Sequence, residues 1–308
     1  MLIFRSLQIP KKLFGSVLAI GNFDGIHLGH QSVILKAKKI ARDSQSKVGV
    51  LTFEPHPKCY FKKEYEYFRL TPFRIKIEIL KSLGVEFVIN LTFNKNLSKI
   101  SANDFLKIFL IENLKVSHVV TGFDFVFGNK QSGDVDHIRK YSKDVKKFNY
   151  TEVPELNINN QEISSSHIRN LLRNGDISEA NLILSRQWTV VSRVIKGEQK
   201  AREIGFKTAN LKINKYCDLC HGVYSVSIFL EKNNKEYFGI ANFGIKPTFN
   251  KVDPLLEIHI FNFDREIYGK KIKVSFKKFI RREKKFDSIQ KLKEQIQEDI
   301  NFVKTNND

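Results

Sequence analysis

The first half of the chain alternates two hydrophobic patterns: short continuous apolar runs, and longer segments whose apolar residues recur every three or four positions. The first pattern predicts buried strands and the second predicts amphipathic helices. The expected strands are 17–22, 48–53, 86–91 and 116–122, with helices between them at 30–42, 72–83 and 102–115. This alternation favours right-handed crossovers and a mostly parallel sheet. Because such a sheet binds ligands beyond the carboxyl ends of its strands, the loops after positions 22, 53 and 122 are the first places to look for function.

The helix expected at 72–83 is bounded by residues with known end preferences. Thr71 suits the N-cap, Pro72 suits the first helical position, and Gly84 suits the residue that ends a helix.

The second half changes pattern after a helical pair at 165–173 and 177–184. From Trp188 onward, short alternating segments rich in β-formers predict an antiparallel barrel or sandwich. These segments are 189–195, 222–230, 237–243, 256–261 and 272–276. One amphipathic helix ends the chain, and its apolar stripe of Ile289, Leu292, Ile296, Ile300 and Val303 is expected to pack against the rest of the fold. We place the domain boundary between 185 and 186, giving domains 1–185 and 186–308.

Composition narrows the class of protein. The 308 residues include 42% hydrophobic residues, enough for substantial cores, and 52 Lys+Arg against 33 Asp+Glu give a net charge of +19. This charge suits nucleic acid or polyanionic small molecules as ligands, and it equally suits lysines on solvated faces. The longest stretch without Asp, Glu, Lys or Arg has twelve residues, whereas a membrane-spanning helix needs about 18 or more. Three cysteines fit a reducing compartment. We expect a cytoplasmic protein without a secretory signal or membrane partner.

A glycine-rich loop follows the strand expected at 17–22. It reads Gly-Asn-Phe-Asp-Gly-Ile-His-Leu-Gly-His over residues 21–30 and opens a helix. Glycine lets the backbone approach a phosphate, and the helix N-terminus offers unpaired N–H donors. His27 and His30 can donate hydrogen bonds to the same phosphate. The alternative is a glycine-rich turn with two solvated histidines, which the position between strand and helix makes the weaker interpretation.

A second cluster of donors begins the helix expected at 165–173. Three hydroxyls, Ser164, Ser165 and Ser166, are followed by Arg169. One serine suffices to cap a helix, so three together with an arginine favour anion binding at the N-terminus over capping alone.

With these loops, further motifs in the first half resemble the adenylyltransferase half of bifunctional bacterial riboflavin kinase/FAD synthetases, within the HxGH nucleotidyltransferase superfamily. Those motifs are Thr52–Pro57, Arg69–Pro72 and Gly122–Gly128. The second half resembles the kinase half of the same family. Its motifs are Arg202–Leu211, Gly222–Tyr224, Gly239–Phe249, Leu256–His259, Tyr268–Gly269 and Arg281–Phe286. The resemblance runs in order from about position 19 to 299, nearly the whole chain.

The resemblance implies an α/β Rossmann-like domain followed by a mainly antiparallel β-barrel kinase domain. It implies that ATP phosphorylates riboflavin to FMN, and that a second ATP adenylylates FMN to FAD with release of pyrophosphate. Mg²⁺ is the expected metal, while zinc and haem are not expected. The expected partners are small molecules and not nucleic acid, with apo-flavoproteins as recipients of the product. The alternatives are that one activity has been lost, or that the chain is a basic nucleic-acid-binding protein.

Site residues follow from the motifs and the resemblance together. For adenylyl transfer, His27 and His30 are expected to be catalytic donors. The ATP and its phosphates are assigned to Gly21, Asn22, Phe23, Asp24, Gly29, Ser164, Ser165, Ser166 and Arg169, and the flavin or nucleotide pocket to His56 and Asp124.

For the kinase step the nucleophile is a neutral hydroxyl, so a carboxylate is needed to accept its proton. Glu257 fits this role, although a solvent-facing glutamate on a half-buried strand is the plainer interpretation without the resemblance. The resemblance assigns Mg-ATP to Gly205, Thr208 and Asn210, with Thr208 and Asn210 as metal ligands, and assigns flavin to Arg281, Glu283 and Phe286.

Some positions depart from the family's usual residues. Ala201 stands where Gly is usual and Lys207 where Pro is usual, and Arg is common at the positions of Val126, Gln131 and His167. Cys217 and Cys220 form a Cys-x-x-Cys-His sequence, but no second ligand pair accompanies it, so we expect two ordinary loop cysteines.

Overall fold

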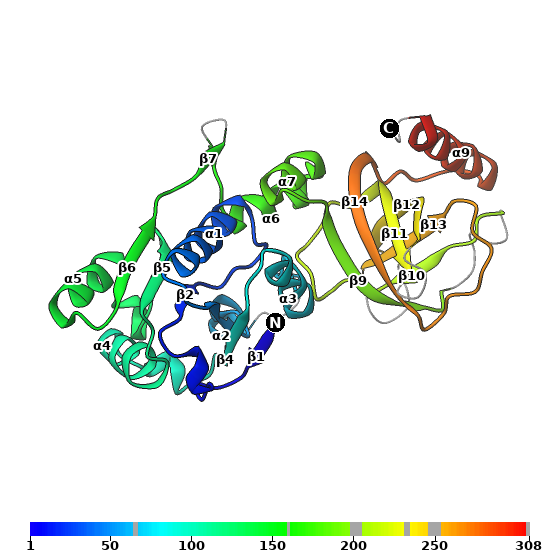
Figure 1. Ribbon diagram of the computed structural model, residues 1–308. Helices are drawn as coiled ribbons and strands as arrows, with labels where there is room; N and C mark the ends of the chain where they lie inside the picture. Colours follow the sequence, from blue (N-terminus) through cyan, green and yellow to red (C-terminus); the bar gives the residue numbers. More distant parts are fainter. Residues whose placement is uncertain (64–66, 159–160, 198–204, 231–234, 246–253, 306–308) are drawn as a thin grey trace. The chain divides into compact units, whose positions relative to one another are not determined.

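The computed structural model describes residues 1–63, 67–158, 161–197, 205–230, 235–245 and 254–305 (Figure 1). It divides into two compact units. One comprises Met1–Tyr65 and Arg69–Ser165, and the other comprises Glu66–Phe68 and Ser166–Asp308. The chain contacts therefore divide near Ser165, while the sequence-based boundary between 185 and 186 stays a prediction. Helices α6 (Ser165–Asn174) and α7 (Ile177–Leu184) lie between these two positions.

The first unit is built on a parallel sheet with strand order β1-β4-β3-β2-β5-β6. From β2 the chain first adds strands on one side and then returns to add β5 on the other, so a topological switch point lies between β2 and β5. The strands are β1 (Leu2–Phe4), β2 (Val17–Ile20), β3 (Val48–Glu54), β4 (Phe87–Thr92), β5 (His118–Gly122) and β6 (Asn149–Val153), and a separate hairpin joins β7 (Asn157–Ile158) to β8 (Gln161–Glu162).

Helices cover both faces of this sheet, and each face has its own apolar core. Residues of α1 and α3 join one core, while residues of the π-helix η3 and of α5 join the other. The strands β2, β3, β4 and β5 are largely buried on both faces, which explains their continuous apolar sequence, whereas the edge strands β1 and β6 are exposed or half-buried. The helices are η1 (Lys11–Leu13), α1 (Leu28–Asp43), α2 (Pro57–Lys62), α3 (Phe73–Ser82), η2 (Leu97–Lys99), α4 (Ala102–Asp104), η3 (Phe105–Asn113), η4 (Asn129–Gln131) and α5 (Val135–Val145).

The second unit is a closed antiparallel barrel with strand order β10-β13-β12-β11-β14-β9 (Figure 1). Large side chains such as Trp188, Tyr224 and Phe276 are fully buried in it. Its elements after α7 are β9 (Trp188–Ile195), β10 (Ala209–Leu211), β11 (Gly222–Leu230), β12 (Glu236–Ile245), β13 (Pro254–Ile260), β14 (Lys271–Arg282) and α9 (Ile289–Thr305). The expected fold class, a Rossmann-like α/β unit followed by an antiparallel barrel, is confirmed.

Two predicted details are wrong. Pro72 is the N-cap of α3 and not its first helical residue. The reason is that Pro72 has a ψ of 155°, an extended and not a helical value, so the helix begins at Phe73. In α9 the apolar stripe packs through Ile300 and Val303, whereas Ile289 is 69% exposed.

Candidate active sites

The turn between β2 and α1 adopts a strained backbone conformation. Phe23, Gly25 and Ile26 have φ values of 48°, 89° and 43°. A positive φ is costly for a bulky or β-branched residue. Phe23 and Ile26 are 1% and 0% exposed and belong to the core between the sheet and α1. Burial of these two side chains therefore helps to hold the strained turn, residues 21–27, in place.

The two histidines of the motif lie together at the start of α1. His27 is the N-cap residue, and its Nδ1 accepts a 3.4 Å hydrogen bond from the His30 N–H. Because Nδ1 accepts, the neutral His27 ring carries its proton on Nε2. The two rings stack with centroids 3.7 Å apart, and a Cβ at Gly29 would lie 3.2 Å from His27 Nδ1. The motif thus forms a compact group of N–H donors at a helix N-terminus.

Two buried charged side chains, Asp24 and Lys76, make hydrogen bonds that hold the turn 21–27 in place. Asp24 is 1% exposed and accepts hydrogen bonds from the N–H groups of Leu70 and Thr71 at 3.2 and 3.0 Å. Lys76 of α3 is fully buried, and its Nζ donates to the Asn22 carbonyl at 2.7 Å. The sequence analysis missed Lys76, although its place four residues before Leu80, on the apolar side of α3, was a signal.

The half-buried Glu54 and the buried Arg69 form an ion pair beside this turn. The Arg69 guanidinium donates to both carboxylate oxygens of Glu54, one of them at 2.9 Å. Burial lowers the pKa of Arg69, but the attraction of Glu54 outweighs it and the net shift is upward. The guanidinium therefore stays charged, and it fixes the end of β3.

The other predicted residues of the adenylyl-transfer site are placed as follows. Ser165 Oγ donates to the Asp24 carbonyl at 2.8 Å, which joins the serine cluster to the turn. His56 is the N-cap of α2, with Nδ1 accepting from the Lys58 N–H at 3.1 Å. Asp124 is exposed in the turn after β5. Asp24, His56 and Asp124 follow β2, β3 and β5, so the parallel sheet brings their three loops to the carboxyl ends of its strands.

Ser166 and Arg169 lie in the other unit. Arg169 is 6% exposed, its Nε donates to the Phe68 carbonyl at 2.8 Å, and its guanidinium lies 4.1 Å from the centroid of the Phe68 ring.

Aromatic side chains gather beyond the ends of β3 and β4. Tyr60, Phe61 and Phe93 pack edge to face with centroid distances of 5.3 to 5.7 Å. Phe61 is 65% exposed, so this group offers an aromatic surface at the ligand edge of the sheet. The sequence analysis missed it, although two aromatic residues soon after His56 were a signal.

In the barrel, strand register brings the predicted kinase residues together. Glu257 of β13 pairs with Asn210 of β10 on one side and with Asn242 of β12 on the other. Side chains at paired positions share one face of a sheet and have Cβ atoms about 5 Å apart. Leu256 and Ile258 are fully buried on the opposite face, so this row projects outward from the barrel core. The sequence analysis missed Asn242 as a site residue.

A cavity of about 320 Å³ lies at one end of this row, where Asn210 and the neighbouring Thr208 line it, whereas Glu257 and Asn242 do not. Asn210 is 4% exposed, and its Oδ1 has no hydrogen-bond partner among the described residues. A Cβ at Gly197 would lie 2.3 Å from Asn210 Nδ2, so glycine is needed there. A buried amide oxygen beside a hydroxyl is the kind of donor set that Mg²⁺ accepts. Across the parts of the chain that the structure describes, no group of three or more His, Cys, Asp or Glu residues is arranged to hold a metal ion.

Two positions singled out from the sequence precede Thr208, and one of them, Lys207, lines this cavity. Gly205 is exposed with φ 93°, and a Cβ there would meet nothing within 4 Å. The Lys207 ammonium pairs with Asp264, and the Lys207 carbonyl accepts a 2.9 Å hydrogen bond from His259 Nδ1. Ala201 lies outside the described residues. Cys59, Cys217 and Cys220 are all buried, and none of the three is in a disulfide bond.

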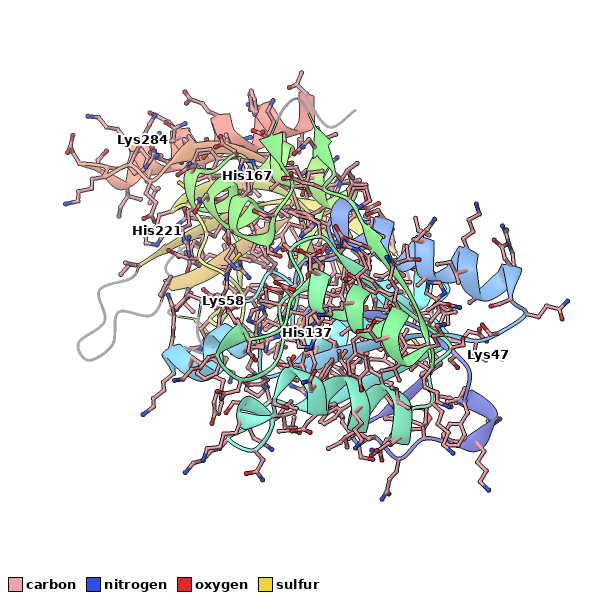
Figure 2. All side chains as sticks on the ribbon, turned by 90° about the vertical axis from the view of Figure 1, so that its left-hand side faces the viewer. Lys47, Lys58, His137, His167, His221 and Lys284 are labelled. Carbon is pink, nitrogen blue, oxygen red and sulfur yellow. The ribbon has the colours of Figure 1, made fainter. Side chains whose placement is uncertain are left out.

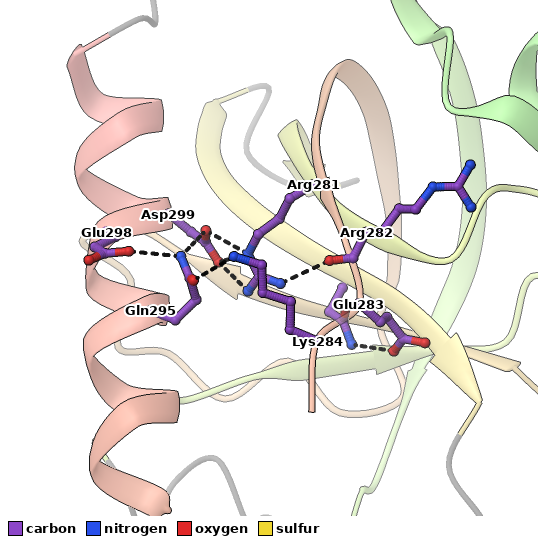
Figure 3. A network of polar contacts seen from close by, with 8 residues as sticks. Arg281, Arg282, Glu283, Lys284, Gln295, Glu298 and Asp299 are labelled. Atoms are coloured by element: carbon purple, nitrogen blue, oxygen red, sulfur yellow. Dashed lines mark hydrogen bonds and ion pairs between the residues drawn. The ribbon is translucent and has the colours of Figure 1, made fainter. Parts of the chain in front are cut away.

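The predicted flavin residues lie at the end of β14 (Figure 3). Arg281 Nε and Nη2 donate to the Asp299 carboxylate of α9 at 2.7 to 3.1 Å, and Asp299 is 4% exposed. This ion pair ties α9 to the barrel. Glu283 Oε1 lies 3.4 Å from Asn242 Nδ2, next to the Glu257 row. Phe286 is half-buried between β14 and α9.

Comparison with known proteins assigns a family to each half. Residues 9–167 match the FAD synthetase family, and residues 184–306 match the riboflavin kinase family. These matches confirm the resemblance stated from the sequence motifs.

Curated relatives match over nearly the full length. The chain is 39% identical to the bifunctional riboflavin kinase/FMN adenylyltransferase of Bacillus subtilis, over 92% of this chain and 90% of that protein. It is 36% identical to the protein of that name from Buchnera aphidicola (Schizaphis graminum), over 99% and 98%, and 32% identical to that from Escherichia coli K12, over 95% and 92%.

A crystal structure titled as a macrolide-efflux protein from Streptococcus pneumoniae superposes with a TM-score of 0.84 at 28% identity, over 98% of this chain and 99% of that one. In the described ranges of this chain, no helix is both long enough and apolar enough to cross a membrane. The family matches and the full-length relatives agree with each other, and the chain belongs to the family of bifunctional riboflavin kinase/FMN adenylyltransferases.

Proposed function

We propose that the chain converts riboflavin to FMN in the barrel unit and FMN to FAD in the parallel-sheet unit, consuming one ATP in each step. The observation that carries this proposal is that each unit holds its own group of polar side chains of the kinds that the two transfers need. In one unit they lie around the turn 21–27 at the ligand edge of the sheet. In the other they form the row Asn210, Glu257 and Asn242, of which Asn210 also lines a cavity.

In the adenylyl-transfer step, an oxygen of the FMN phosphate attacks the α-phosphorus of ATP, and pyrophosphate leaves with the electron pair of the broken bond. The nucleophile is already an anion, so the protein needs to position it and to stabilise charge on the phosphates. The His27 Nε2–H, the His30 ring and the main-chain N–H groups at the start of α1 are donors of this kind. Ser164 and Ser165 add hydroxyls, while the roles of Ser166 and Arg169 rest on the family resemblance alone.

In the kinase step, the 5′-hydroxyl oxygen of riboflavin attacks the γ-phosphorus of ATP, and ADP leaves. The hydroxyl must lose its proton, and we assign that proton to the Glu257 carboxylate. Asn210 and Asn242 flank Glu257 in the same row and can orient the substrate. Glu283 approaches Asn242, and with Phe286 we assign it to the flavin side of the site.

Magnesium is proposed for the barrel cavity. Asn210 Oδ1 and the Thr208 hydroxyl are the oxygen donors that would hold it. When bound, Mg²⁺ neutralises negative charge on the ATP phosphates.

We assign the flavin ring of FMN in the first unit to the aromatic surface of Tyr60, Phe61 and Phe93, beside His56. Exposed aromatic rings are suited to a planar ring system, because offset and edge contacts add to the burial of apolar area. His56 and Asp124 stay proposed members of this pocket.

The ligands proposed here are small molecules and not nucleic acid. Figure 2 shows many long side chains, Lys47 and Lys284 among them, extending outward from the ribbon, and both lysines are exposed. This supports solvated faces as the source of much of the positive charge. Three cysteines outside any disulfide bond support a cytoplasmic location, and apo-flavoproteins are the proposed recipients of FAD.

A two-tube time course tests the proposal. One tube holds enzyme, Mg²⁺, ATP and riboflavin, the other replaces riboflavin with FMN, and the flavins are separated by chromatography. FMN followed by FAD in the first tube supports both activities. FMN alone in both tubes would show that adenylyl transfer has been lost, and FAD in the second tube only would show that the kinase has been lost. No flavin turnover, together with tight nucleic-acid binding at physiological salt, would favour the nucleic-acid alternative.

A further inference from the structure

Lys76 is a charged side chain at a position that packing alone would give to an apolar residue. It lies on the core-facing side of α3, one helical turn before Leu80, and both side chains are 0% exposed. Buried lysines are rare because the ammonium loses its hydration. Lys76 Nζ reaches the main-chain carbonyl of Asn22 at 2.7 Å, and Thr52 Oγ1 donates to the same carbonyl at 3.2 Å.

The charges around Lys76 compensate its burial only in part. Burial lowers the pKa of Lys76 to about 8, the nearby Asp24 and Glu54 carboxylates oppose this fall, and Arg69 adds to it. The folded state therefore disfavours the charged form of Lys76 relative to the neutral form. The contact that the geometry gives this side chain is with the turn, through the Asn22 carbonyl.

The carbonyl that Lys76 binds lies immediately before the strained part of the turn. Asn22 precedes Phe23, whose φ of 48° begins the run of positive φ values that ends at Ile26 and leads into His27. Asp24 fixes the same turn from the other side by accepting from the Leu70 and Thr71 N–H groups.

We propose that Lys76 is a positioning residue for adenylyl transfer: by holding the Asn22 carbonyl, it fixes the turn 21–27 in the conformation that presents His27 and His30 to the nucleotide. This inference rests on the proposed adenylyl-transfer role of the histidines. Lys76 touches no substrate, because its side chain is enclosed beneath the turn.

The test compares Lys76→Met, which keeps the length of the side chain but cannot donate, with Lys76→Gln, which keeps a donor without charge. A displacement of about 1 Å can cost an enzyme about 10²-fold in rate, so we expect kcat for FAD formation from FMN to fall about 10²-fold in Lys76→Met and less in Lys76→Gln. The KM for FMN should change less than kcat. The riboflavin kinase rate of the same molecules should be unchanged, and it reports that the barrel unit is folded and active, while the far-ultraviolet circular dichroism of each variant, compared with the parent, reports whether the parallel-sheet unit is folded.

Lys38→Met is the matched control, because Lys38 Nζ also donates to a main-chain carbonyl, that of Leu83 at 3.1 Å, but from an exposed position on α1. It should retain full activity in both steps. The proposal is overturned if kcat for FAD formation in both Lys76 variants stays near the parent value, if the kinase rate falls in parallel, or if Lys38→Met loses as much. If Lys76→Met does not fold, the Lys76→Gln comparison alone decides in the same way.

A pH profile separates positioning from packing. In the parent, kcat for FAD formation should decline as pH rises through about 8, where Lys76 loses its charge among Asp24, Glu54 and Arg69. The charge-assisted hydrogen bond to Asn22 then becomes a weaker neutral one. This decline of kcat above pH 8 should be absent in Lys76→Met, and a decline that persists in that variant would contradict the proposal. FAD formation by the parent enzyme tests the proposed function separately, so the two can fail independently.

Discussion

The two candidate sites are held together by different physical means. In the first unit the functional side chains stand on a strained turn and on loops, and buried charges and long-range hydrogen bonds tie these segments to one another. In the barrel, Asn210, Glu257 and Asn242 stand on neighbouring strands, and main-chain pairing alone sets their spacing. One site depends on side-chain anchors far apart in sequence, and the other depends on register.

This difference has consequences for substitutions. An anchor beneath a loop can be removed without unfolding the sheet, so the first site should lose activity through changes that do not touch substrate. A register is set by many hydrogen bonds at once, so the barrel site should lose activity mainly through the reacting side chains themselves. The following predictions run from the largest expected effect to the smallest.

Glu257→Gln should lower the riboflavin kinase rate by about 10²- to 10⁴-fold, because an amide cannot accept the proton of the hydroxyl. FAD formation from supplied FMN should be retained. Both rates are measured by flavin chromatography. Glu236→Gln, the same change at an exposed position of β12, is the control and should leave both rates unchanged. An equal loss of both activities in Glu257→Gln would contradict the assignment of the two steps to separate units.

His27→Ala should lower FAD formation by about 10²- to 10³-fold, because a donor to the developing negative charge is lost. The kinase rate should be unchanged. His137→Ala provides the control, since His137 lies on α5 of the same unit and bonds to Asn103. If the control loses as much FAD formation as His27→Ala, the unit is sensitive to any histidine change and the catalytic role is not supported.

Breaking the Arg281–Asp299 ion pair should destabilise the barrel unit by about 3 kcal/mol, because the partner left behind is a buried, uncompensated charge. Denaturant unfolding of Arg281→Met can be followed through the fluorescence of Trp188, the one tryptophan of the chain, which is buried in the barrel. The double variant Arg281→Met/Asp299→Leu should recover much of the loss. No recovery would mean that the packing of α9, and not the buried charge, explains the effect.

The free energy of unfolding of the first unit should depend on Lys76 at alkaline pH. The pKa of Lys76 is lowered from 10.5 to about 8 in the folded state. Between these values the unfolded chain binds a proton that the folded chain does not, so stability rises with pH. The free-energy difference between the parent and Lys76→Met should therefore shift in favour of the parent by up to about 3 kcal/mol between pH 7 and 10.5. Hydrogen exchange of amides in β2 and β3 measures the free energy of unfolding of this unit in each protein. A difference between the parent and Lys76→Met that does not change with pH would show that the pKa of Lys76 is not lowered.

Much of this protein could be predicted from local pattern. The continuous apolar runs and helical spacing predicted β2 to β5 and the helices α1 and α3, because strands buried on both faces need apolar residues at nearly every position. The strands β1 and β6 were missed, since β1 is short and largely exposed and β6 is only half-buried, and the helices α2 and α5 were missed as well. In the barrel the pattern predicted β9, β11, β12, β13 and β14 but not the three-residue β10. The start of α3 was misplaced by one residue: Thr71 has the composition of an N-cap, but Pro72 has an extended ψ of 155° and is the N-cap instead.

The candidate site residues likewise divide into those that a short sequence motif predicts and those that only a contact in the folded protein identifies. His27 and His30 were predicted because their chemistry and neighbours are legible in a short motif, whereas Glu257 was predicted only with the help of the family resemblance. Asn242 and Lys76 were missed, because each becomes a candidate only through a contact with a residue distant in the chain. Asn242 lies beside Glu257 through strand register, and Lys76 donates to the carbonyl of Asn22.

The sequence by itself determined most of the helices and strands, the fold class of each half and the motifs proposed to carry the chemistry, because propensity, periodicity and side-chain type are local properties. Only the tertiary structure decided which side chains act together. Arg281 pairs with Asp299, and Asp24 accepts hydrogen bonds from the segment before α3. A buried charge is stable only beside a polar or charged partner. That partner is supplied by the tertiary fold from a distant part of the chain, so no local sequence pattern identifies it.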